Sequence, residues 1–130
     1  MVAARYTSNN GQAVTLDTAV KYEDLGYDTH NAYDVATGIY TVAVSGVYSI
    51  KAIFAPIAAA SYRLIGIHKN GVSVASKYHD TASANEDGYI DISTDIDLVK
   101  GDEIEIIAEN LTITLDASSK YNHLSIHRIK

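Results

Sequence analysis

Carboxylates are the most abundant groups in this sequence that could do chemistry. Two of them placed together could serve a glycosidase, and five alternate with apolar residues in the stretches 90–98 and 103–108: Asp91, Asp95, Asp97, Glu103 and Glu105. A general acid of this kind needs an apolar pocket that raises its pKa, whereas alternation with apolar residues is typical of the solvated face of a strand. We expect solvated strand faces and predict that the protein is not an enzyme.

Oxygen ligands for a metal ion occur mainly in the polar stretch 77–88, which we expect to be a long exposed loop. The metal candidates there are Asp80, Glu86 and Asp87, with Asn85 beside them. An earlier stretch adds the carboxylates of Asp24 and Asp28. Calcium requires several oxygen ligands brought together, and the order of an EF-hand loop is absent. We therefore predict no cofactor, with calcium as the alternative.

Several classes of function find no motif in the sequence. The chain has no cysteine, which excludes a disulfide scaffold and cysteine metal sites. It also lacks a phosphate-binding loop and a dinucleotide-binding glycine motif, and Val44-Ser45-Gly46 lacks the residues that flank a nucleophile elbow. The net charge of −6 argues against a nucleic-acid partner. No apolar run approaches the roughly 20 residues of a membrane span, and residues 1–11 lack the apolar centre of a signal peptide.

The elements that must position these groups are strands. Apolar residues recur at every second position in 40–44, 47–54, 90–98, 103–108 and 123–127, which is the period of a half-buried strand. Turn signals separate these stretches at Asn10-Gly11, Ser45-Gly46, Asn70-Gly71 and Gly101-Asp102. Many short strands at regular spacing favour a sandwich or barrel. The chain length of 130 residues suits one domain, 1–130, with Tyr48, Ile50, Phe54, Ile92 and Ile106 in its core.

The stretch TGIYTVAVSGVYSIKA, residues 37–52, resembles the central signature of the C1q-like domains, which share a jelly roll with the tumour necrosis factor family. The matching positions are Thr37, Gly38, Tyr40, Val44, Gly46 and Tyr48. Further segments resemble the family in the family's order: AARYTSNN, AVKYEDLGYDTHNAYDVATG, RLIGIHKNGVSV, DISTDIDLVKGDEIEI and YNHLSIHRIK. The resemblance therefore covers nearly the whole chain.

This resemblance implies an all-β fold, a two-sheet jelly roll of about ten strands that forms a homotrimer. It also implies a recognition head without catalysis, which binds its ligand at outer surfaces. The chain departs from the family at Ala43, at Ile50 and in its closing strand, and it carries no collagen-like stalk. We interpret these departures as those of a divergent microbial or phage-type member, located outside the cell or on a virion surface.

The leading hypothesis is a receptor- or glycan-binding tip of a phage tail fibre or surface adhesin. Polar and aromatic residues of two expected loops are the candidate ligand contacts: Tyr27, His30, Asn31, Tyr33, Tyr78, His79, Asp80 and Asn85. Tyrosine suits this role because it stacks on sugar faces and carries a hydroxyl. One alternative is a structural trimerisation cap of a longer fibre with no ligand of its own. A carbohydrate-active enzyme is a third hypothesis.

His123, Ser125 and His127 share one face of the closing strand and are the candidate trimer-interface residues. Because that strand lies near the trimer axis in the family, the resemblance implies that symmetry triples each histidine. A ring of three imidazoles could bind zinc or nickel, and plain packing or hydrogen bonding across the interface is the alternative. The Asn110-Leu111-Thr112 sequon is a further candidate site, for glycosylation.

Overall fold

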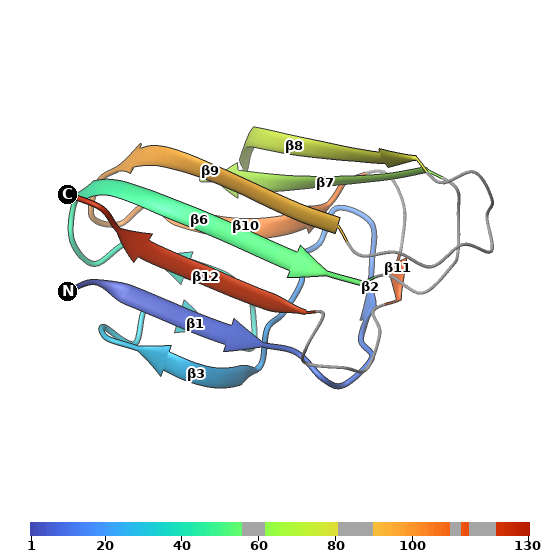
Figure 1. Cartoon of the computed structure of the whole chain (residues 1–130), viewed down its shortest axis with the longest axis horizontal. Coiled ribbons are helices and arrows are strands. Elements are labelled where there is room, and N and C mark those ends of the chain that lie inside the picture. The colour runs from blue at the N-terminus through green and yellow to red at the C-terminus, as the bar shows by residue number, and fades with distance from the viewer. Residues whose placement is uncertain (56–61, 81–89, 110–112, 115–121) are drawn as a thin grey trace.

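The computed structural model describes residues 1–55, 62–80, 90–109, 113–114 and 122–130, and every regular element in these ranges is a strand (Figure 1). The strands are β1 Ala3–Thr7, β2 Ala13–Val14, β3 Asp24–Asp28, β4 Tyr33–Asp34, β5 Ile39–Thr41, β6 Gly46–Phe54, β7 Tyr62–Lys69, β8 Val72–Asp80, β9 Ile90–Leu98, β10 Glu103–Ala108, β11 Ile113–Thr114 and β12 His123–Arg128. The two main sheets take up ten of these strands, in agreement with the expected number. Within the described ranges, no helix has the length and apolar character that a membrane crossing requires.

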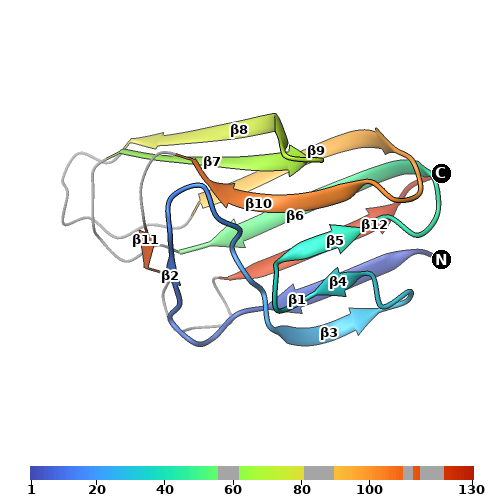
Figure 2. The same cartoon turned by 180° about the vertical axis from the view of Figure 1, so that it is seen from behind.

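Two antiparallel five-stranded sheets form a sandwich. The first has the strand order β3-β1-β12-β6-β9 and lies in front in Figure 1, and the second has the order β4-β5-β10-β7-β8 and lies in front in Figure 2. The short strands β2 and β11 form a separate pair. Both chain termini lie at one end of the sandwich (Figure 1). The predicted two-sheet jelly-roll architecture is therefore confirmed.

The core lies between the two sheets, where the period-two pattern places it. The five residues expected there, Tyr48, Ile50, Phe54, Ile92 and Ile106, are all buried. Burial of a large apolar side chain contributes roughly 1.5–3 kcal/mol, so these positions are a main source of stability. Opposite them, the carboxylates of β9 and the first carboxylate of β10 are exposed, as predicted: Asp91, Asp95, Asp97 and Glu103.

Tyrosine contributes much of this core. Five tyrosines in the described part of the chain are buried: Tyr6, Tyr22, Tyr33, Tyr40 and Tyr48. The rings of Tyr6 and Tyr33 pack with centroids 4.6 Å apart, and the Tyr48 hydroxyl donates to the carbonyl of Val44 at 2.6 Å. Burial raises the pKa of Tyr6 to about 12, with smaller contributions from Asp28. These side chains therefore act as core residues whose hydroxyls need partners.

The turn signals were predicted correctly, but one of the four closes a hairpin within one sheet and the other three connect strands of different sheets. Asn70 and Gly71 have φ of 51° and 82° and close the β7–β8 hairpin, as a type I′ turn requires. At Ser45-Gly46, by contrast, the chain passes from β5 in the second sheet to β6 in the first. A Cβ on Gly46 would clash with Arg128 and with the carbonyl of Lys130, so a side chain there is excluded by the C-terminal segment.

The expected loop at 77–88 begins later than predicted. β8 continues to Asp80, so Lys77, Tyr78, His79 and Asp80 are strand residues. The error has a physical reason, because β8 is the edge strand of its sheet and edge strands carry polar side chains that discourage further pairing. The rest of that stretch lies outside the described residues.

Candidate functional site

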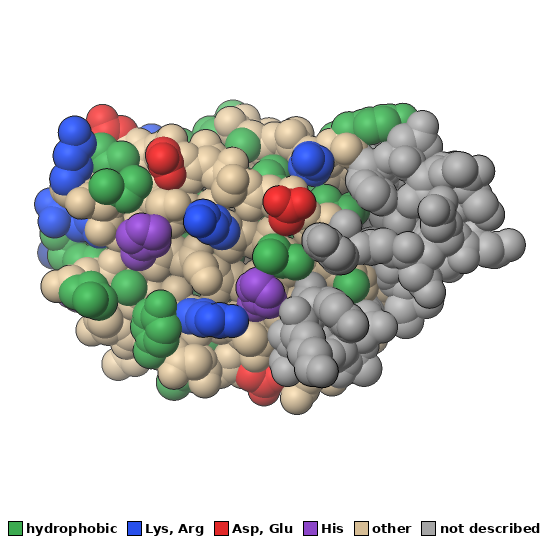
Figure 3. All heavy atoms as spheres, viewed as in Figure 1, with side chains coloured by type: hydrophobic (Ala, Val, Ile, Leu, Met, Phe, Trp, Pro, Cys, Tyr) green, Lys and Arg blue, Asp and Glu red, His purple; other side chains and the backbone are tan. Residues whose placement is uncertain are grey.

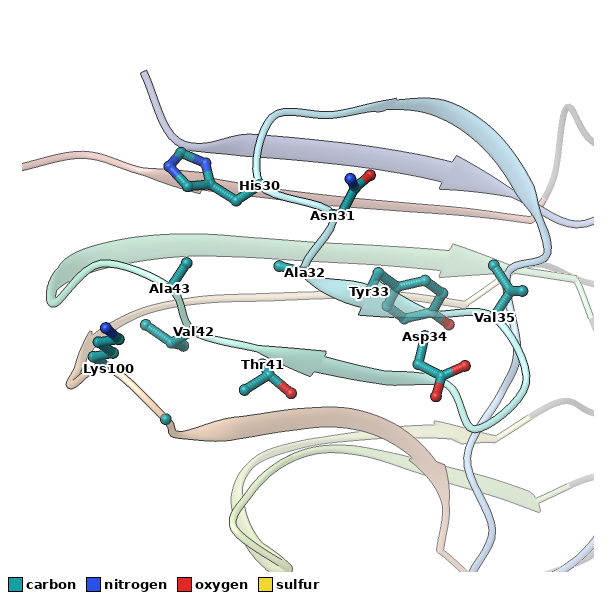
Figure 4. Close-up of a pocket in the computed structure, with 11 residues that line it drawn as sticks. His30, Asn31, Ala32, Tyr33, Asp34, Val35, Thr41, Val42, Ala43 and Lys100 are labelled. Atoms are coloured by element: carbon teal, nitrogen blue, oxygen red, sulfur yellow. The ribbon is translucent and has the colours of Figure 1, made fainter.

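A hollow of about 690 Å³ opens beside β4 and β5 (Figure 4). These two strands lie in the half of the sandwich that holds the termini (Figure 2). Two stretches that are distant in sequence form it: residues 30–43, which include β4 and β5, and the turn between β9 and β10. The lining residues are His30, Asn31, Ala32, Tyr33, Asp34, Val35, Thr41, Val42, Ala43, Lys100 and Gly101. Three predicted ligand contacts, His30, Asn31 and Tyr33, therefore come together here.

Asp28 fixes the shape of the segment that carries His30 and Asn31. Its Oδ2 accepts hydrogen bonds from the backbone N–H groups of Ala32 at 2.9 Å and Tyr33 at 3.0 Å, and from the Tyr6 hydroxyl at 3.0 Å. Its Oδ1 accepts one from the backbone N–H of His30 at 3.2 Å. Protein donors thus contact both carboxylate oxygens, so Asp28 holds this segment in shape.

Tyr33 lines the hollow without being free to contact a ligand through its hydroxyl. Its side chain is buried, contrary to the exposure we expected, and its hydroxyl accepts from the backbone N–H of Tyr22 at 3.0 Å and donates to the carbonyl of Val20 at 3.4 Å. Burial, above all, raises the pKa of Tyr33 above its ordinary value. The period-two pattern could not predict the burial of Tyr33, because a strand of two residues is too short to show alternation and beside a polar stretch it resembles a loop.

The groups that face the hollow and remain exposed are polar and carry both charges. His30, Asn31, Asp34, Thr41 and Lys100 are exposed, and Figure 4 shows them coming from the segments on both sides of the hollow. The Asp34 carboxylate accepts from the backbone N–H of Ala36 at 2.9 Å, and the Ser45 hydroxyl accepts from the backbone N–H of Lys100 at 2.9 Å. These hydrogen bonds hold the backbone near Asp34 and at Lys100 in place, while the side chains of the two residues keep donors and acceptors for a ligand.

This set of groups suits reversible binding. It offers one carboxylate, one ammonium, one imidazole, one amide and one hydroxyl, spread over a surface hollow. Among the hydrogen bonds of the described residues, none joins two of these lining side chains. Sequence reasoning missed Asp34, Thr41 and Lys100. The signal for Lys100 was its place next to the recognised Gly101-Asp102 turn.

The other predicted ligand contacts lie elsewhere. Tyr27 is on β3 and Tyr78 is on β8, both about half exposed and neither at the hollow. His79 and Asp80 also belong to β8, although their side chains lie outside the described part. Asn85 and the metal candidates Glu86 and Asp87 lie outside it too, as does the Asn110 sequon. In the ranges that are described, no three His, Cys, Asp or Glu side chains gather as a metal site would require.

Comparison with known proteins identifies the family. The model of the C1q domain matches residues 2–123. This chain belongs to the C1q domain family. No curated protein matches it significantly by sequence.

Solved structures agree with the C1q assignment. The globular domain of zebrafish complement 1qA protein is 18% identical, with 100% of this chain and 98% of that chain covered and a TM-score of 0.82. An Eiger TNF from S. frugiperda is 12% identical, with 99% and 92% covered and a TM-score of 0.84. Murine APRIL is 11% identical, with 98% and 98% covered and a TM-score of 0.81. At these identities the likeness establishes the shared fold.

C1q and TNF domains are typically extracellular, form homotrimers and bind receptors, and they are generally non-catalytic. The residues predicted for the trimer interface of this C1q domain, His123, Ser125 and His127, lie on β12 and face outward from the first sheet. His123 and Ser125 are partly buried and His127 is exposed. Burial, and then the charge of Arg5, lowers the pKa of His123.

Sequence reasoning also missed a polar cluster on the outer face of the second sheet. His68 Nε2 lies 2.7 Å from Glu109 Oε2, and the Ser76 hydroxyl donates to Glu109 Oε1 at 2.8 Å. Burial alone would raise the pKa of Glu109, but the hydrogen bonds from His68, Ser76 and Ser73 outweigh it and hold the pKa below its ordinary value. The carboxylate stands between the imidazole and the hydroxyl, so the imidazole cannot activate Ser76 as it would in a catalytic triad.

Proposed function

We propose that this C1q domain is the head of a homotrimer that recognises a repeated surface ligand, such as a glycan on a host cell. In this proposal it forms the tip of a phage tail fibre or of a surface adhesin. The observation that carries the proposal is the hollow beside β4 and β5, with its five exposed polar side chains and no pair arranged for catalysis. A sugar ligand suits such a set because its hydroxyl groups both donate and accept hydrogen bonds.

Assembly as a trimer would give the head its strength of binding. Three weak sites on one rigid body gain avidity when the target repeats. Two edge strands support assembly, because they expose large apolar side chains in described regions: Leu25 and Tyr27 on β3, and Val72, Val74 and Tyr78 on β8. Exposed apolar side chains on neighbouring positions are typical of surfaces that bind other proteins.

The test has two parts, carried out on the same preparation. Light scattering across a dilution series should give three times the 14.0 kDa mass of the chain. Glycan-array and whole-cell binding should then be compared for wild type, Lys100→Ala, Asp34→Asn and the control Lys21→Ala, since Lys21 is exposed and lies outside the hollow. Loss of a charge-assisted hydrogen bond costs about 1.5–3 kcal/mol, so each hollow variant should bind about tenfold more weakly or worse.

The outcomes separate this function from the structural alternative. A trimer that binds no glycan and no cell, in a form that folds normally, would identify a trimerisation cap without its own ligand. Binding that both hollow variants retain at full strength would move the ligand site to another surface. A chain that stays monomeric would remove the avidity on which the proposal depends.

A further inference from the structure

The hollow beside β4 and β5 holds two exposed charges of opposite sign, Asp34 and Lys100. Neither side chain forms an ion pair with another described residue. Within the same part of the chain, the Asp34 carboxylate accepts one hydrogen bond, from the backbone N–H of Ala36 to Oδ1 at 2.9 Å. Both charges are therefore available to a molecule that enters the hollow.

The two charges stand toward opposite ends of the hollow, because their segments flank different parts of β5. Asp34 lies opposite the first residue of β5. The turn that carries Lys100 donates a hydrogen bond to the carbonyl of Val42, just beyond the last residue of β5, at 2.8 Å. Three residues of extended chain span about 10 Å. Figure 4 shows Thr41 between the two charged side chains. A ligand that meets both charges must therefore be longer than one sugar ring.

Neutral polar groups complete the lining. Asn31 and Thr41 are exposed and offer an amide and a hydroxyl. His30 Nδ1 lies 2.8 Å from the Thr29 hydroxyl, which also accepts from the backbone N–H of Ala3 at 3.0 Å. One ring nitrogen of the histidine is thus engaged, and Nε2 has no partner among the described residues. Sugar hydroxyls suit these groups because a hydroxyl both donates and accepts hydrogen bonds.

The two charges restrict which sugar binds best. A charged group that loses water without gaining a partner of opposite sign weakens binding. A sugar with a carboxylate alone would pair with Lys100 and be repelled by Asp34, and a sugar with an ammonium alone would have the reverse effect. A neutral sugar would form hydrogen bonds with both residues but gain no attraction between opposite charges. A ligand that carries both charges satisfies both ends of the hollow.

We propose that the hollow binds a zwitterionic saccharide, in which one sugar carries a carboxylate and the next sugar a free ammonium group. The proposal rests on the proposed recognition of a surface glycan at this hollow and names the class of that glycan. The carboxylate meets Lys100, the ammonium meets Asp34, and ring hydroxyls bond to Thr41 and Asn31. A free amino acid carries the same two charges on one carbon atom, which is too short a separation to meet both ends.

A second hollow, on the outer face of the first sheet, provides an internal comparison. Its volume is about 430 Å³, and its lining residues are Ser49, Lys51, Ser93, Thr94 and Asp95. Figure 3 shows that face, where blue and red side chains both occur. Lys51 lies opposite Ser93, two residues from Asp95 along β9. Diagonal neighbours on adjacent strands lie within reach of long side chains, so these two charges can neutralise each other without a ligand.

A matched set of four disaccharides tests the proposal on the whole chain. The parent compound joins glucuronic acid to glucosamine with a free amine. The second compound has the amine acetylated, the third has the carboxylate reduced to the alcohol, and the fourth has both changes. The same four forms are made from galacturonic acid and galactosamine, so that the result does not depend on one sugar configuration. NMR titration at low salt measures the Kd per binding site, to which avidity does not contribute.

Four variants accompany the wild type. Asp34→Asn keeps an Oδ1 acceptor for the backbone N–H of Ala36, and Lys100→Gln keeps the backbone bond to the Ser45 hydroxyl. Lys51→Gln and Asp95→Asn make the same two changes at the second hollow. Far-ultraviolet circular dichroism and thermal unfolding identify any variant that fails to fold.

We expect the wild type to bind the zwitterionic disaccharide about tenfold more tightly than either singly charged form. Lys100→Gln should abolish the advantage of the carboxylate and keep that of the amine. Asp34→Asn should do the opposite, and so bind the acetylated acid as tightly as the zwitterion. The two variants at the second hollow should behave as the wild type does. A merely structural role of Asp34 or Lys100 would weaken all four compounds alike.

Other results would overturn the inference, and they are distinguishable from failure of the proposed function. If the neutral or the acidic form binds as tightly as the zwitterion and the hollow variants weaken it, the hollow is a glycan site but not a zwitterion site. If none of the compounds binds, the inference fails, while glycan-array and cell binding still decide the proposed function. If only Lys51→Gln and Asp95→Asn weaken binding, the ligand lies at the second hollow, and both the inference and the proposed site fail.

Discussion

Asn70 Nδ2 donates a hydrogen bond to Asp102 Oδ1 at 2.9 Å and so ties the β7–β8 turn to the β9–β10 turn. The link is reinforced on both sides. Asn70 Oδ1 accepts from the backbone N–H of Glu103 at 2.8 Å, and Asp102 Oδ2 accepts from the backbone N–H of Val99 at 2.9 Å. Both turns were recognised in the sequence by their glycines, but the bond between them depends on the side chains beside those glycines.

The Asp102 carboxylate should make the fold sensitive to acid. Hydrogen bonds from Asn70 and Val99, and then the charge of Lys69, lower the pKa of Asp102. A folded-state pKa below the unfolded value of about 3.9 contributes stability above that pH, and the contribution is lost as pH falls through the folded pKa. Urea unfolding of wild type at about pH 6 and about pH 3 should show this loss, and Asp102→Asn should show a smaller difference between the two.

Asn70→Gly is the matched control, because glycine accepts the left-handed φ of 51° while removing the side chain. It should reproduce much of the reduced acid sensitivity of Asp102→Asn at unchanged turn geometry. An equal acid response in wild type and both variants would show that other carboxylates determine it.

Two buried tyrosines should respond differently to loss of the hydroxyl. Tyr33→Phe leaves the backbone N–H of Tyr22 buried without its acceptor, which costs about 1–3 kcal/mol of unfolding free energy. The Tyr22 hydroxyl is buried and has no hydrogen-bond partner among the described residues, so Tyr22→Phe should be neutral or stabilising. Urea midpoints of the two variants provide the comparison. A Tyr22→Phe variant as unstable as Tyr33→Phe would mean that a water molecule satisfies that hydroxyl.

Much of the fold was readable from the sequence because a buried strand face leaves a period of two. Tyr48, Ile50 and Phe54 mark the core face of β6 in this way. The connection at Ser45-Gly46 was predictable only as a turn. A turn signal specifies a local φ, but it does not specify whether the next strand pairs with the preceding strand or joins the other sheet. That choice depends on pairing with strands that are distant in the sequence, since β6 pairs with β9 and β12.

The candidate site was predicted in part for a related reason. His30 and Asn31 stood out by residue type in a polar stretch, and both line the hollow. Lys100 comes from a turn much later in the chain, and its arrival beside them depends on the pairing of β5 with β10. Pairing of distant strands leaves no local pattern, and so the hollow as a whole was not predictable from sequence spacing.

Gly66 makes room for the Glu109 carboxylate, and a double-mutant cycle should show it. A Cβ at Gly66 would overlap that carboxylate, so Gly66→Ala should displace it from His68 and Ser76 and lower stability. When Glu109→Ala has already removed the carboxylate, the same change should become favourable, because alanine is better than glycine within a strand by roughly 0.5–1 kcal/mol. Chemical unfolding of the four proteins gives the coupling energy. Equal effects of Gly66→Ala in both backgrounds would contradict this role.

His123 should have a pKa below that of an ordinary histidine, and this pKa should depend on Arg5 on the adjacent strand. Burial is the larger cause of its lowered pKa and the charge of Arg5 the smaller, and Arg5 and His123 lie on adjacent strands of the first sheet. Arg5→Ala should therefore raise the pKa of His123 without restoring it fully, because the contribution of burial remains. Since the folded-state pKa is depressed, His123 should lower stability as pH falls below the unfolded value of about 6.5. Histidine proton shifts followed by NMR, with His123→Gln to assign the signal, measure the pKa, and urea unfolding across the same pH range measures the stability. A pKa that does not move in Arg5→Ala would exclude the electrostatic contribution of Arg5.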